Sequence, residues 1–106
     1  MMLLDLDPQW LIKDGKRVGF TFLSPTGKQG PIHWRQSCFV GPAPGMREQW
    51  ALFGEDANVQ GCTRGCAWSI AGGIDNATFA TIAVKPSIDG SAGGLWHGFI
   101  QNGEIK

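Results

Sequence analysis

The sequence has no excess of positive or negative charge, and it has no long apolar run. Nine basic residues balance nine acidic residues, so the formal net charge is zero. Because phosphate contacts need Lys and Arg, this balance argues against nucleic acid and anionic membrane surfaces as partners. The first six residues, MMLLDL, have no basic start, and no apolar run approaches the roughly eighteen residues of a membrane helix. We therefore expect neither a signal peptide nor a membrane span.

The sequence is also poor in cysteine and in recognisable catalytic patterns. Three cysteines, an odd number, do not make a secreted disulfide scaffold, which favours a reducing cytoplasm or a particle assembled there. The glycines form no phosphate-binding loop. The carboxylates are scattered through predicted turns, and no pair has a spacing that fixes its geometry. We predict no catalytic residue and no organic cofactor.

Glycine, tryptophan and phenylalanine are abundant. The 106 residues include 16 Gly, five Trp and six Phe. Glycine at this level marks tight turns between short elements, and the large aromatic side chains supply the buried area that a small core needs. A chain of this length fits one domain, residues 1–106, with about 5,800 Å² of folded surface.

Two dipeptides predict hairpin turns, because their residues tolerate positive φ: Asp14-Gly15 and Asn102-Gly103. The strand expected after the first turn, residues 17–23, alternates so that Val18, Phe20 and Phe22 share one face.

Further strands are expected at residues 32–40, 78–84 and 95–101. Residues 24–31, with two Pro and two Gly, predict a loop. Residues 46–53 fit either a helical turn or a strand. The sequence therefore predicts a mainly β fold, a small single-domain β-sandwich or partly open barrel of six to eight short strands with at most one or two short helical turns.

One thiol pair has a spacing that zinc can use. Cys62 and Cys66 lie four residues apart in a glycine-flanked segment, and a loop of this kind can turn both sulfurs toward one point. His97 is the preferred third ligand, with His33 and Cys38 as the other candidates. Two alternatives remain, namely reduced thiols that act as small apolar groups and a Cys62–Cys66 disulfide. His33 and His97, each beside a Trp in a predicted strand, are expected to be local hydrogen-bonding residues rather than a catalytic pair.

The most specific stretch is the C-terminal part, with Trp68, Thr78-Phe79, Pro86-Ser87-Ile88 and Trp96-His97-Gly98-Phe99-Ile100. It resembles a family of small uncharacterised phage and bacterial proteins, some of which carry the label ammonia monooxygenase, over about residues 68–106. Members usually have a Cys-x-x-Cys-type cluster well before the Trp and often a Cys just before the His. Here the thiols adjoin Trp68, and Leu95 precedes Trp96. The monooxygenase label has no support in these residues.

The resemblance supplies no established activity. Together with the zero net charge, the abundance of Trp and the lack of a catalytic constellation, it leads us to expect a phage or prophage protein that works by protein–protein contact, without catalysis, as a virion-associated component such as a capsid decoration. The partner would be a second copy or a phage or host protein, and the location would be the host cytoplasm or the virion. Two alternatives are kept: a small inhibitor or adaptor of a host protein, for example in anti-defence, and a zinc-stabilised module or small hydrolase.

Overall fold

The computed structural model describes residues 1–30, 32–41, 44–53, 59–60, 68–89 and 95–106. Four strands form the first sheet in the order β1-β2-β3-β4. These strands are β1 (Gln9–Lys13), β2 (Lys16–Gln29), β3 (Ile32–Phe39) and β4 (Val59–Gln60). The first three pair antiparallel, and β4 pairs parallel to β3. Pro8 directly precedes β1, which lies at a sheet edge where the missing N–H of a proline is tolerated.

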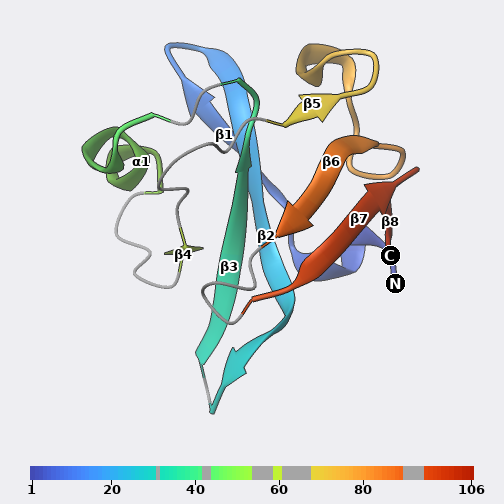
Figure 1. Ribbon diagram of the computed structural model, residues 1–106. Coiled ribbons are helices and arrows are strands. Elements are labelled where there is room, and N and C mark those ends of the chain that lie inside the picture. The colour runs from blue at the N-terminus through green and yellow to red at the C-terminus, as the bar shows by residue number, and fades with distance from the viewer. Residues whose placement is uncertain (31, 42–43, 54–58, 61–67, 90–94) are drawn as a thin grey trace.

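The second sheet is antiparallel, in the order β5-β6-β7-β8. Its strands are β5 (Ser69–Ile70), β6 (Val84–Asp89), β7 (His97–Gln101) and β8 (Glu104–Ile105). The N-terminal residues extend this sheet beyond β8, because Met2 bridges to Glu104 and the Leu3 N–H donates to the Gly103 carbonyl at 2.7 Å. Figure 1 shows β6 and β7 running obliquely to the long strands β2 and β3.

The main hydrophobic core lies between the two sheets. Phe20 and Phe22 of β2 pack in one cluster with Val84 of β6 and Ile100 of β7, and all four are at most 3% exposed. The sheets also meet along the backbone, because the Trp68 N–H donates to the Phe39 carbonyl at 3.0 Å. The mainly β prediction is therefore confirmed, and the sandwich is the form that the described residues adopt.

Helical structure is limited, among the described residues, to one α-helix and two short 3-10 turns. The turns are η1 (Leu3–Leu6) and η2 (Ile74–Asn76). The helix α1 (Met46–Phe53) takes the helical alternative for this segment. Its Phe53 packs against Phe39 with the ring centroids 6.1 Å apart, so the helix covers part of the outer side of the first sheet. No helix in the described ranges is long and apolar enough to cross a membrane.

Both predicted hairpin turns are confirmed. Asp14 and Gly15 join β1 to β2 with φ values of 53° and 77°. Asn102 and Gly103 join β7 to β8 with φ values of 51° and 71°. The two-residue hairpin turn that these dipeptides favour requires positive φ at both central residues.

Two predicted segment boundaries are wrong. Residues 24–29 belong to β2, which continues to Gln29, rather than to a loop, and the register shift between Leu23 and Lys28 accommodates Pro25. Residues 78–81 form a turn, and the strand predicted at 78–84 begins only at Val84. The β-branched composition of residues 78–84 favoured a strand there, but the partner strand β7 pairs with residues 84–89.

The predicted common face of Val18, Phe20 and Phe22 is correct for the two phenylalanines only. In the ladder with β1, Leu11 pairs with Gly19 and Ile12 pairs with Arg17, so Val18 is the extra residue of a β-bulge. Val18 packs instead against the second cluster, formed by Leu11 and Phe39.

Candidate binding face

The outward side of the second sheet carries the most exposed aromatic residue of that sheet. Along β7 the odd positions face outward and the even positions face the core, so Phe99 is 47% exposed while Ile100 is fully buried. The register places four outward residues on neighbouring strands around Phe99. We call this surface the Phe99 face, made by Ser69, Lys85, Phe99, Gln101, Glu104 and Lys106.

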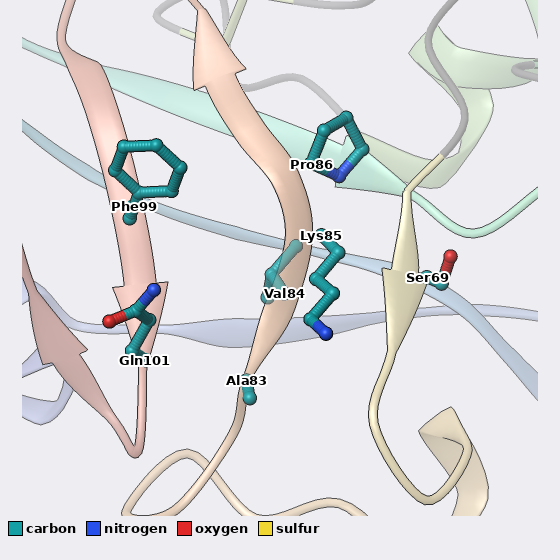
Figure 2. A pocket seen from close by; sticks show the side chains of 7 residues that line it. All are labelled: Ser69, Ala83, Val84, Lys85, Pro86, Phe99 and Gln101. Atoms are coloured by element: carbon teal, nitrogen blue, oxygen red, sulfur yellow. The ribbon is translucent and has the colours of Figure 1, made fainter.

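The Phe99 face is hollowed between β5, β6 and β7. The hollow has a volume of about 530 Å³, and most of its lining surface is apolar. Figure 2 shows the side chains that line the hollow. They come from β5, β6 and β7 and from Ala83, the residue before β6. They are Ser69, Ala83, Val84, Lys85, Pro86, Phe99 and Gln101. A volume of this size lies within the range of small-molecule pockets.

The polar groups of the hollow have no partner among the described residues. The Lys85 ammonium forms no ion pair there, and the side chains of Ser69 and Gln101 form no hydrogen bond within that part of the chain. The three groups supply an ammonium, a hydroxyl and an amide beside the apolar rings of Phe99 and Pro86. A mostly apolar wall with a few polar groups is the usual lining of a binding site.

Buried contacts hold the backbone beneath the Phe99 face. Trp96 is 8% exposed, and its indole lies where a Cβ of Gly98 would be, so position 98 accepts only glycine without movement of the indole. The Gln36 side chain binds the Trp96 backbone from the first sheet: its Nε2 donates to the Trp96 carbonyl at 3.1 Å, and its Oε1 accepts from the Trp96 N–H at 3.0 Å. These contacts fix the start of β7 and therefore the position of Phe99.

The predicted zinc ligands Cys62 and Cys66 lie outside the described residues, so the site with His97 stays a prediction. His97 is exposed on β7, Cys38 is buried in the main core, and His33 shares a 2.7 Å hydrogen bond between Nε2 and the Ser24 carbonyl. No group of three His, Cys, Asp or Glu side chains in the described ranges could hold a metal ion.

Sequence reasoning identified the segments of the hollow but not the hollow itself. Pro86 and Phe99 lie in two of the motifs that carry the resemblance, and Lys85 directly precedes one of them. The alternation along residues 95–101 could have shown that Phe99 points away from the core, since Ile100 is its apolar neighbour. Sequence alone could not show that Lys85 and Phe99 line one hollow, because the pairing of β6 with β7 is irregular between Val84 and Ile88.

No family model matches the chain, and no curated protein or solved structure matches it significantly.

Proposed function

We propose that the protein acts by binding a protein partner through the Phe99 face, without catalysing a reaction. The observation that carries the proposal is the hollow itself, in which exposed apolar rings stand beside donors that have no partner among the described residues. Exposed aromatic residues in a concave site are typical of the centre of a protein interface.

The narrower proposal is a phage or prophage protein that is carried on the virion, for example as a capsid decoration. It is supported by the resemblance over residues 68–106, because all seven lining residues of the hollow fall within that stretch. The absence of net charge also favours assembly, since copies of the chain do not repel each other strongly.

A pair of matched variants tests both levels of the proposal. Phe99→Glu places a charge in the hollow, whereas Trp50→Glu makes the same change at an aromatic residue of α1 that is 64% exposed. Each protein is expressed in the bacterium that carries its gene, the phage is induced, and the purified particles are analysed by quantitative mass spectrometry. We expect wild type and Trp50→Glu to be present on the particles at equal levels and Phe99→Glu to be lost at least about tenfold.

The other outcomes separate the alternatives. A wild-type protein that is absent from the particles and strictly monomeric by mass photometry contradicts the virion proposal. Recovery of one stoichiometric host protein that requires Phe99 supports the adaptor alternative. Equal recovery of partners by wild type and Phe99→Glu contradicts the assignment of the Phe99 face.

A further inference from the structure

Two lysines flank Phe99, one on each side. Lys85 lies on β6 on one side, and Lys106 lies on the other, since the Lys106 N–H donates to the Phe99 carbonyl at 2.8 Å. Glu104 is paired with Gln101, one position further along the strands. Within the described part of the chain, Lys85 and Lys106 form no ion pair, whereas Lys13 and Arg35 of the first sheet each pair with a carboxylate. With respect to the described residues, the two ammonium groups can therefore pair with an incoming anion.

The apolar part of the hollow favours a ligand with a large apolar side chain. The rings of Phe99 and Pro86 form its walls, and a leucine- or phenylalanine-sized side chain that covers them removes apolar surface from water, which is favourable. The flanking lysines would then distinguish ligands by their charge. They attract a carboxylate that stands next to the apolar side chain, and they repel a basic residue in the same place.

The size of the hollow indicates a short segment of the partner. Seven residues line it, whereas a stable interface between two folded proteins takes about 20–30 residues from each side. A single extended segment can place one apolar side chain in the hollow and a neighbouring acidic side chain on Lys85 or Lys106.

We propose that the Phe99 hollow recognises an acidic peptide segment of the partner, in which a carboxylate side chain stands next to a large apolar one. The proposal rests on the proposed function and specifies the chemistry of its partner. The apolar side chain fills the space between Phe99 and Pro86. The carboxylate pairs with the ammonium group of Lys85 or Lys106 and accepts a hydrogen bond from a nearby donor of the hollow, such as Ser69 or Gln101.

A selection from a random heptapeptide library tests the recognised chemistry without knowledge of the partner. The library is panned separately against wild type, Lys85→Glu and Lys16→Glu. Lys16 is an exposed residue at the first hairpin of the first sheet, so its variant has the same net charge as Lys85→Glu with the hollow unchanged. We expect wild type and Lys16→Glu to enrich peptides with Asp or Glu beside Leu, Phe or Trp by about fivefold or more over the starting library.

The Lys85→Glu variant should lose this preference and enrich Lys or Arg beside the same apolar residues. The selected peptides should also fail to bind Phe99→Ala, whose folding is checked by its thermal unfolding transition. Three results would overturn the proposal: no enriched motif, a motif without acidic residues, or the same acidic motif from Lys85→Glu.

The two proposals fail in distinguishable ways. If particles or partners are recovered in a Phe99-dependent manner but the selected peptides have no acidic preference, the function stands and the acidic recognition falls. If acidic peptides bind the hollow but partner recovery does not depend on Phe99, the hollow binds such peptides and the proposed function falls.

Discussion

At the scale of single residues, the side-chain amide of Gln36 connects the two sheets. It is 3% exposed and satisfies both backbone groups of Trp96, as donor to the carbonyl and as acceptor from the N–H. In the sequence of residues 32–40, every second residue from Ile32 onward is apolar except Gln36. Its partner could not be predicted from the sequence, because Trp96 is sixty residues away and the contact exists only when the sheets pack.

Replacing this amide should destabilise the fold. In Gln36→Leu the buried Trp96 carbonyl loses its partner, while the Trp96 N–H keeps the Ser24 Oγ at 3.2 Å. We expect a loss of about 2 kcal/mol in the free energy of unfolding, measured by urea titration. The control Gln9→Leu changes an exposed glutamine and should stay within about 0.5 kcal/mol of wild type. A Gln36→Leu protein as stable as the control would contradict the role given to the amide.

At the scale of elements, local chemistry predicts the turns better than the strands between them. Asp14-Gly15 and Asn102-Gly103 define their hairpins because the required positive φ is a property of those residues alone. Residues 78–84 have the composition of a strand, but most of them have no strand partner, and β6 instead contains Pro86. Strand propensity is overridden where the tertiary pairing lies elsewhere.

The contact between α1 and β1 predicts a response to alkaline pH. Glu48 Oε2 accepts a hydrogen bond from Lys13 Nζ at 2.7 Å, and this bond and the charge of Glu48 raise the pKa of Lys13 above its ordinary value of 10.5. A raised pKa means that the folded state favours the protonated lysine. The stabilisation is therefore complete below pH 10.5 and is lost as pH rises through the folded pKa.

We expect this loss to be small, because both side chains are exposed to solvent. The melting temperature of wild type should fall slightly more steeply than that of Glu48→Gln between about pH 9 and pH 12. Lys16→Met serves as the control, since it removes a lysine that has no ion pair among the described residues. Parallel profiles for wild type and Glu48→Gln would show that the contact makes no contribution.

At the scale of the whole molecule, composition and alternation predict the fold class. The accessible surface of 6235 Å² is close to the area expected for a chain of this mass, and the core lies between two sheets. The Phe99 face could not be predicted in the same way. It combines residues of β5, β6, β7 and β8 with Lys106, and their relative positions follow from the register of these strands and from the register shift near Pro86.

The zinc hypothesis can be decided by elemental analysis of protein purified without added metal. A structural site needs four ligands, and Cys38 is buried in the core while His33 and His97 lie on different sheets. We therefore expect clearly less than one zinc per chain and a melting temperature that a chelator does not change. About one zinc per chain, released by His97→Ala, would establish the site and contradict this expectation.

The first and last residues are neighbours in the second sheet, because the Ile105 N–H donates to the Met1 carbonyl at 2.8 Å. A short linker could therefore join residue 106 to residue 1, and the chain could be reopened at Asp14-Gly15 as a circular permutant. Any cargo fused to either end of the original chain would emerge at one border of the molecule, next to Lys106 and so beside the Phe99 face. A fusion through the new ends would instead leave that surface unobstructed.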